Sequence, residues 1–519
     1  MSRRPHVTRI AAAAAAALAA GALAGAPAAA QEAAVETAKP AIELVTLPSP
    51  ESPLVAVRLM LDVGSIHDPA GKEGLAALTG LMVAQAGTSE RSYSELVEAL
   101  YPMAASIGVS TDREVTVISG QVHRDTLAEY TALLTEAVLS PGFAAADFER
   151  NKEQLAAFLT STLRSANDEL LGLEALQDTI FAGHPYGHPP AGSVQGLAAI
   201  TLDDVKRFYA EHYTRGNLML GVAGGYPEGY VERLVARLGG LPAGSEGRMP
   251  LPDPPKVEGR RFTLIDKEAG AVGIHFGYPL PLDRADDDWY PLLVANSYLG
   301  EHRTFHGRLM QQLRGLRGLN YGDYSYIEYW EAPPFTSAPS PGVPRRQQYF
   351  SVWIRPVRPE TAHFALRNAL YEVERLEANG MTETDFELTR DFLVNYSKLW
   401  AQSLSDRLGF HMDSRFYGMP YYIDEIERRL GELTVEEVNA AAKKYLGTDA
   451  YQAVLVTDDA AAVAAYLEAG EPSPITYNAE VPAEVTEGDK AIQKLPVNPT
   501  AIEIVPVGEV FETGKALGG

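Results

Sequence analysis

Residues 74–88 read Gly74-Leu75-Ala76-Ala77-Leu78-Thr79-Gly80-Leu81-Met82-Val83-Ala84-Gln85-Ala86-Gly87-Thr88. The run carries no charge and no histidine, and small or aliphatic side chains occupy nearly every position. A helix that is apolar all round is one that is buried. The run therefore predicts an internal helix near the start of a globular domain.

Two groups of residues elsewhere in the chain recur in the same order at nearly the same spacing. Gly142, followed by Asp147-Phe148-Glu149, returns as Gly380, followed by Asp385-Phe386-Glu387. Thr201, which precedes an acidic residue three positions on, returns as Thr434 with the same pattern, and each copy leads to a tyrosine and a strand-like apolar run. A threonine with an acid three residues later is typical of a helix N-terminus. The repeated order and spacing indicate a duplicated chain.

The duplication and the composition shifts divide the chain into six parts. We expect a signal peptide over 1–30, a leader over 31–40, a first domain over 41–238, a Pro/Gly-rich linker over 239–259, a second domain over 260–470 and an extended tail over 471–519. Strand-like and helical patterns alternate irregularly inside each domain, which favours an α+β fold with helices packed on a mainly antiparallel sheet.

The N-terminus has the pattern of an export signal. Arg3, Arg4 and Arg9 precede a short apolar run, which ends in the small residues Ala28-Ala29-Ala30 before Gln31. A basic start, a short apolar stretch and an A-x-A ending describe a secretory signal, and the stretch is too short to span a bilayer. No later segment is long and apolar enough to do so. We expect an exported, soluble protein of the periplasm.

Composition excludes several classes of function. The chain has 519 residues, 44 Lys plus Arg against 68 Asp plus Glu, a net charge of −24 and no cysteine. So acidic a chain repels nucleic acid and anionic membranes, and it favours basic peptides instead. Without cysteine there can be no disulfide, thiolate metal site or cysteine nucleophile.

Two histidine pairs have a spacing of four residues. His302 and His306 would share one face of a helix, but no acid lies between them and a third metal ligand is missing. A solvated or packed pair is the simpler interpretation. His184 and His188 flank Pro185 and Gly187, so that segment is expected to be a loop.

The run at 74–88 resembles the zinc-site helix of insulinase/pitrilysin-type peptidases, whose pattern is G-L-A-H-F-L-E-H-M-x-F-x-G-T. The resemblance continues through Tyr93-Ser94-Glu95-Leu96, the loop at 184–187, the helix beginning after Thr201, and the stretch Leu313-Arg314-Gly315-Leu316-Arg317-Gly318-Leu319-Asn320-Tyr321. These segments occur in the family's order between about 45 and 465. The resemblance implies two homologous insulinase-like domains in a clamshell arrangement.

The resemblance fails at the zinc ligands. The two histidine positions are Ala77 and Leu81, and the glutamate position is Gly80. The family's third ligand, a glutamate, would fall within 156–159, where no carboxylate occurs; Glu153 lies just outside. Alanine, glycine and leucine can neither bind zinc nor take a proton from water. We expect no metal, no catalytic residue and no cofactor in this chain.

The second-domain motif is retained. The resemblance implies that Arg314 and Tyr321 reach across the chamber to a substrate at the zinc site opposite, with Arg317 as a weaker substrate-binding candidate. A guanidinium suits peptide carbonyls and a phenol suits an oxyanion. Tyrosines 324, 326 and 329 and Trp330 follow, and they fit a peptide-lining surface or a buried sheet face. The Pro-rich segment 332–344 would line the chamber or form an idle surface loop.

Two functions compete. Some bacterial members of the family pair a zinc-bearing subunit with a similar subunit that supplies the arginine and tyrosine. This chain resembles the second kind, a zinc-less peptide-binding or regulatory subunit of a heterodimer, with zinc only in the partner that carries H-x-x-E-H. The alternative is a structural or binding protein on the degenerate fold, like the core proteins of respiratory complexes. The retained arginine and tyrosine favour the first.

Overall fold

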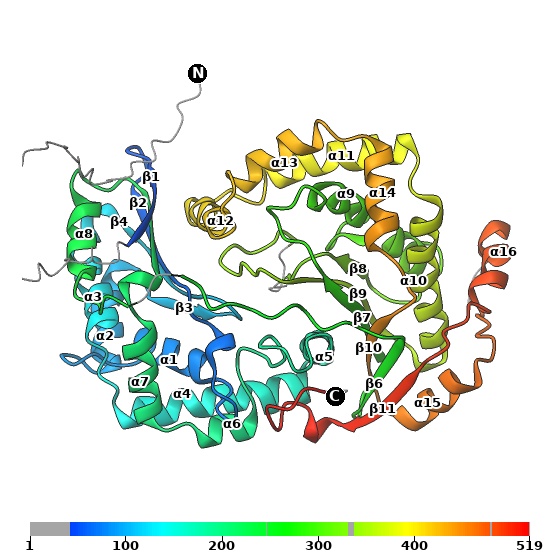
Figure 1. The fold of residues 1–519 in the computed structure, drawn as a ribbon, viewed down its shortest axis with the longest axis horizontal. Coiled ribbons are helices and arrows are strands. Elements are labelled where there is room, and N and C mark those ends of the chain that lie inside the picture. The colour runs from blue at the N-terminus through cyan, green and yellow to red at the C-terminus, as the bar shows by residue number, and fades with distance from the viewer. Residues whose placement is uncertain (1–41, 245–246, 331–336, 478–479, 518–519) are drawn as a thin grey trace, which may run out of the picture.

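The computed structural model describes residues 42–244, 247–330, 337–477 and 480–517. The predicted signal and leader lie outside the described residues. Figure 1 shows two lobes, each with a sheet and a layer of helices. Among the described residues, no helix has the length and apolar character needed to cross a membrane.

The first lobe contains a five-stranded sheet in the order β1-β5-β2-β4-β3. Only the β1–β5 pair is parallel, and the other neighbours are antiparallel. Its strands are β1 Glu43–Pro48, β2 Leu54–Leu61, β3 Gly108–Thr111, β4 Thr116–His123 and β5 Leu218–Gly224. Its helices are α1 Leu75–Ala84, α2 Tyr93–Leu100, α3 Leu127–Leu139, α4 Ala145–Ala157, α5 Asp168–Ile180, α6 Val194–Ala199, α7 Leu202–His212 and α8 Tyr230–Leu238.

The second lobe contains a six-stranded sheet in the order β11-β6-β10-β7-β9-β8. Its strands are β6 Arg260–Asp266, β7 Val272–Leu280, β8 Asp323–Tyr326, β9 Gln348–Val357, β10 Tyr451–Thr457 and β11 Ala501–Pro506. Its helices are α9 Trp289–Gly300, α10 Pro359–Asn379, α11 Glu383–Ser397, α12 Leu404–Phe416, α13 Tyr422–Leu430, α14 Val435–Tyr445, α15 Ala460–Ala469 and α16 Ala483–Ile492.

The two sheets confirm the duplication. Apart from β11, the strand order of the second sheet repeats that of the first with each strand number raised by five. The parallel pair β1–β5 of the first sheet corresponds to the parallel pair β6–β10 of the second. Thr201 caps α7 and Thr434 caps α14, each by accepting the N–H of the acidic residue three positions on. The predicted α+β class with two homologous, mainly antiparallel domains is confirmed.

One helix from each half of the chain packs on the sheet of the other lobe. Helix α12 of the second half packs on β1, β2 and β5, and α5 of the first half packs on β7 and β10. The approach of α5 depends on Gly172, since a Cβ there would lie 2.4 Å from Cδ2 of His275 on β7. The exchange fixes how the two sheets face each other.

A buried ion pair also joins the lobes. The Arg345 guanidinium is bidentate to Asp112, with distances of 2.6 and 2.7 Å, and donates to Gln177 of α5 at 2.8 Å. All three side chains are buried. Upstream, the backbone N–H of Gly342 donates to Asp413 of α12 at 3.0 Å. A Cβ at Gly342 would lie 3.2 Å from Nη1 of Arg58 on β2, so the described part of the Pro-rich segment contacts the first lobe and is not an idle surface loop.

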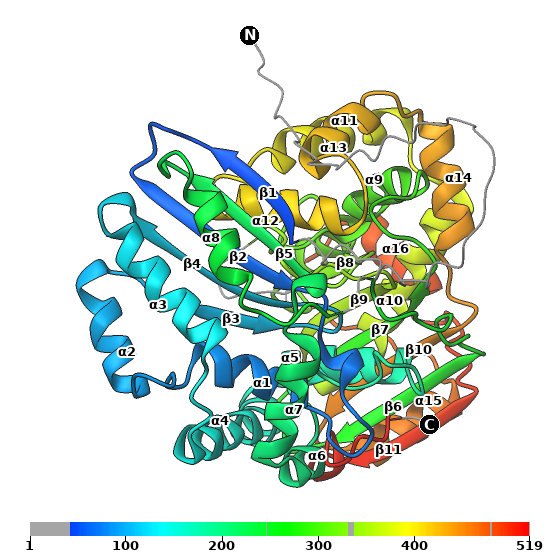
Figure 2. The same ribbon diagram turned by 60° about the vertical axis from the view of Figure 1, so that its left-hand side comes forward.

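The expectation of an extended tail after residue 470 is wrong. This part of the chain forms α16 and then β11, which pairs in parallel with β6 at the edge of the second sheet (Figure 2). It then returns to the first lobe, where Val510, Phe511 and Leu517 are buried. These few buried apolar residues are separated by polar residues and prolines. The composition of the segment therefore gave no indication that it packs against the first lobe.

We predict that Arg164→Ala loosens this C-terminal contact. The Arg164 guanidinium donates to the Val510 carbonyl at 2.7 Å and pairs with Glu512 at 2.9 Å. Hydrogen bonds of charged groups contribute about 1.5–3 kcal/mol. Chemical denaturation should show a loss of about 2 kcal/mol, and amide exchange at residues 507–517 should accelerate. Unchanged exchange there would contradict the contact.

Candidate functional site

Helix α1 carries the three positions, Ala77, Gly80 and Leu81, that correspond to the family's two histidine ligands and its glutamate. Ala77 is 8% exposed, Gly80 is buried and Leu81 is half-buried. A Cβ at Gly80 would lie 3.0 Å from Oγ1 of Thr111 and 3.2 Å from Cγ2 of Val109, both on β3. The strand therefore occupies the space that a glutamate at position 80 would need.

Residues 156–159, where the family's third ligand would fall, contain no acid. Helix α4 continues into a wider π-helical turn, η4 Phe158–Ala166. Ala156 is half-buried, Leu159 is fully buried, and Glu153 points to solvent. Within the described ranges, no three His, Asp or Glu side chains converge as a metal site would require. The side chains present do not fit a zinc ion.

The histidine pairs do not form a site. His302 and His306 lie in turns rather than on a helix; His302 is buried with Nδ1 2.5 Å from the Tyr326 hydroxyl, while His306 is exposed. His184 and His188 lie in a loop, as expected. Nε2 of His184 lies 3.2 Å from the Pro252 carbonyl.

The structure brings Arg314 and Tyr321 together. Arg314 lies in the π-helical turn η6 Met310–Gly315, and Tyr321 lies between that turn and β8. The guanidinium carbon is 4.6 Å from the centre of the Tyr321 ring and 5.2 Å from that of Phe305. The two rings are 69% and 64% exposed, respectively. A half-buried cation thus lies against two rings that face solvent.

Asp323 lies close enough to Arg314 for the two charges to interact. It is fully buried and accepts a hydrogen bond from Asn320 at 2.6 Å. Burial raises the pKa of Asp323 to about 8, against the opposing effects of Asn320, Arg314 and Arg355. At neutral pH this carboxyl is therefore largely protonated, so it adds little negative charge near Arg314.

Arg317 is not part of the exposed pair. Its Nε lies 2.9 Å from Oδ1 of Asp489 on α16, and its Nη1 donates to the carbonyl of Gln312. Both charged side chains are buried. Arg317 anchors the C-terminal segment, so its predicted contact with substrate does not fit this placement.

Two profiles of one peptidase family match the chain. Residues 44–193 match the insulinase domain of peptidase family M16, and residues 199–393 match the M16 inactive domain. The chain belongs to the insulinase family, M16.

Relatives in the M16 family include both named proteases and a named non-peptidase. An uncharacterized zinc protease of Mycobacterium bovis is 25% identical over 408 residues, covering 77% of this chain and 87% of that protein. The non-peptidase homolog YmxG of Helicobacter pylori is 23% identical over 384 residues, covering 74% and 84%. The M16 inactive domain structure from Pseudomonas fluorescens has a TM-score of 0.71 at 24% identity, covering 81% and 96%. This chain has the inactive M16-like fold.

The tyrosine-rich strand of this M16 chain is a buried sheet face. Tyr324 and Tyr326 pack with Met310, Trp330 and Trp353 and are nearly inaccessible. Tyr329 lies under the buried Arg345, with the guanidinium carbon 3.6 Å from its ring centre. Of the two interpretations left open by the sequence, the buried face is correct, and Tyr321 is the exposed member of this aromatic group.

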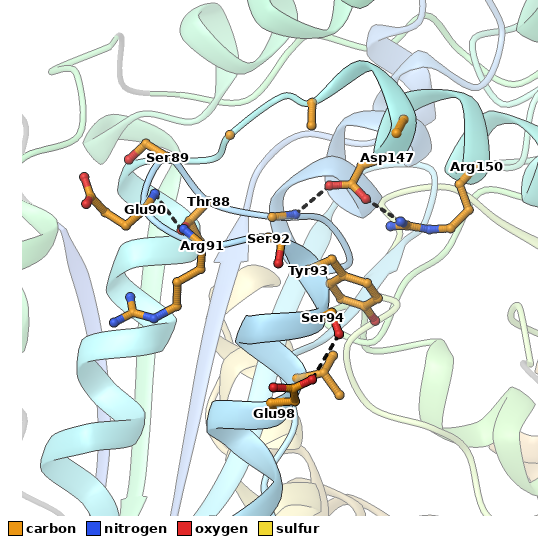
Figure 3. Close-up of a pocket in the computed structure, with 15 residues that line it drawn as sticks. Thr88, Ser89, Glu90, Arg91, Ser92, Tyr93, Ser94, Glu98, Asp147 and Arg150 are labelled. Atoms are coloured by element: carbon orange, nitrogen blue, oxygen red, sulfur yellow. Dashed lines mark hydrogen bonds and ion pairs between the residues drawn. The ribbon is translucent and has the colours of Figure 1, made fainter.

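A pocket of about 810 Å³ opens beside α2 and the start of α4 (Figure 3). Sequence reasoning did not single it out. Two of its charged groups are paired with each other: Asp147 accepts the Gly87 N–H at 2.9 Å and also binds Arg150, which covers the Tyr93 ring. These contacts hold the loop that follows α1 and leave neither side chain free for chemistry.

Proposed function

We propose that this chain is a zinc-less, peptide-binding subunit of a heterodimeric insulinase-type metallopeptidase. It contributes Arg314 and Tyr321 to the active site of a similar partner that carries an intact H-x-x-E-H. The observation that supports this most directly is the asymmetry between the lobes. In the first lobe, small or apolar residues stand at the positions of the family's zinc ligands. In the second lobe, Arg314 and Tyr321 lie together, and the Tyr321 ring faces solvent.

The chemistry of the pair suits a peptide substrate. A guanidinium presents a fixed fork of N–H donors to carbonyl oxygens, and an exposed phenol can donate to an oxyanion that develops during hydrolysis. In the first lobe, β3 lies at the edge of its sheet beside α1. Edge strands bind extended peptides by adding them to the sheet.

The test is to co-express the chain with a zinc-bearing relative and to measure peptide hydrolysis for each subunit and for the mixture. We expect activity only in the mixture. Stoichiometric zinc or hydrolysis in this chain alone would refute the proposal. Activity of the partner that does not change when this chain is added would favour a binding role outside proteolysis, in line with the relative named a non-peptidase homolog.

Arg314→Ala and Tyr321→Phe should each lower kcat of the mixture by about 10²-fold, the scale for losing one transition-state donor. Tyr101→Phe is a matched control, because Tyr101 is also exposed but lies on the other lobe. It should keep full activity. Normal turnover in both Arg314→Ala and Tyr321→Phe would remove these residues from the active site.

We also propose export to the periplasm through residues 1–30. The mature protein recovered from cells should begin at Gln31, and intact-mass measurement would show this. A full-length mass in the periplasmic fraction would contradict cleavage at that position.

A further inference from the structure

Several arginines around Arg314 pair with a carboxylate, whereas Arg314 has no acidic partner among the described residues. Arg308 pairs with Glu372 at 3.1 Å, Arg317 with Asp489 at 2.9 Å, and Arg355 with Glu169 at 2.7 Å. No carboxylate among the described residues lies within 4.0 Å of the Arg314 guanidinium, although the chain contains 68 acidic residues. An unpaired cation in so acidic a chain is available to a ligand.

The polar contacts of Arg314 within the chain are weak. Within the described part of the chain, its one hydrogen-bond contact runs from Nη1 to Sδ of Met310 at 4.0 Å, and a thioether is a poor acceptor. The carboxyl of Asp323 is buried and largely neutral at pH 7, so it supplies little counter-charge. The donors of the guanidinium are therefore not used up inside the fold.

Phe305 and Tyr321 orient this cation. Both ring centres lie within 6 Å of the guanidinium carbon, the range of cation–π attraction. Both rings also expose most of their surface. An arginine in contact with two exposed aromatic rings combines a charge with apolar contact area, and arginine and tyrosine are enriched among the residues that dominate binding energy at interfaces.

We infer that Arg314, Phe305 and Tyr321 bind a carboxylate of the peptide ligand. The inference rests on the proposed function, because it takes the ligand to be a peptide. A carboxylate accepts two parallel hydrogen bonds from a guanidinium and compensates its positive charge. A peptide carbonyl has a single oxygen to accept hydrogen bonds and no net charge. The carboxylate can be the peptide C-terminus or an Asp or Glu side chain.

The net charge of −24 limits which peptides fit. At physiological salt, exposed charges farther apart than about 8 Å are largely screened, so repulsion acts on those acidic groups of a bound peptide that lie close to carboxylates of this chain, while Arg314 compensates only one. The site therefore favours peptides with one well-placed carboxylate over peptides with many.

The experiment uses the full mature chain and one fluorescent decapeptide in four forms. One pair differs at the C-terminus, as free acid or amide, and the other at one internal position, as Glu or Gln. Anisotropy gives Kd, and the same peptides serve as substrates of the complex with the zinc-bearing partner to give kcat/KM. We expect one acid form to bind at least about 10-fold more tightly than its neutral form, with a kcat/KM higher by a similar factor, because its hydrogen bonds are charge-assisted. The pair that shows the ratio identifies the source of the carboxylate.

Variants test whether this ratio depends on the aromatic–arginine site. Arg314→Gln should bring it to about one, Arg314→Lys should retain part of it, and Phe305→Ala should weaken both forms alike. Arg358→Gln is the control, because Arg358 is exposed and paired with Glu360. It should leave the ratio unchanged.

Three outcomes separate the two proposals. Equal binding and turnover of acid and neutral forms, with peptide activity intact, would overturn the carboxylate inference and leave the proposed function standing. A carboxylate preference that survives Arg314→Gln would also overturn the inference. Neither binding nor turnover of any peptide would overturn both.

Discussion

Replacing Arg345 by methionine should lower the free energy of unfolding by about 3–5 kcal/mol. The guanidinium is fully buried between the lobes, where it binds both oxygens of Asp112 at 2.6 and 2.7 Å. Removing it leaves the Asp112 carboxylate buried without its partner, and an isolated buried charge is costly. Chemical denaturation followed by tryptophan fluorescence would measure the loss.

Two further variants make this expectation specific. Arg358→Met removes an arginine from an exposed ion pair with Glu360, which should change stability by no more than about 1 kcal/mol. The double variant Arg345→Met with Asp112→Leu removes both buried charges, so it should recover much of the loss. If Arg345→Met alone is as stable as the natural chain, the buried pair does not hold the lobes together.

Local signals in the sequence predicted the repeated domain. Thr201 and Thr434 each cap a helix, and such caps depend on residues only three positions apart. Such short-range patterns can be read without knowledge of tertiary contacts. The equivalence of the two halves, and hence the fold class, followed from the repeated order of these signals.

Contacts between distant segments were not predictable in the same way. Arg345 and Asp112 are 233 residues apart, and nothing local to either residue marks the pairing. The exchange of α5 and α12 is equally non-local, because no short-range pattern in either helix indicates which of the two sheets it will cover. The polar C-terminal segment was misjudged because only a few residues, such as Phe511, anchor it to the first lobe.

At the candidate site, resemblance to the family supplied Arg314 and Tyr321, and the structure adds Phe305. An isolated aromatic residue in a turn gives no sequence signal of ligand binding. Arg317 shows the opposite error. It lies three residues from Arg314 and looked similar, but on this turn its side chain points inward to Asp489.

Restoring the family motif in α1 should not restore a zinc site. We expect the triple variant Ala77→His, Gly80→Glu, Leu81→His to bind no stoichiometric zinc and to lose about 4 kcal/mol or more of stability. Overpacking a tight core costs about 1–3 kcal/mol, and burying an unpaired carboxylate adds further cost. The Cβ position at residue 80 is already only 3.0 Å from Thr111 of β3.

The missing third ligand prevents binding even if α1 adapts. Catalytic zinc sites need three protein ligands, and residues 156–159 supply only Ala, Phe and Leu side chains. Gly80→Ala separates the packing cost from the charge cost, because it adds the Cβ alone. Metal analysis after dialysis, together with denaturation of both variants, would measure the two effects. One equivalent of retained zinc in the triple variant would show that the α1 positions alone determine whether this lobe binds metal.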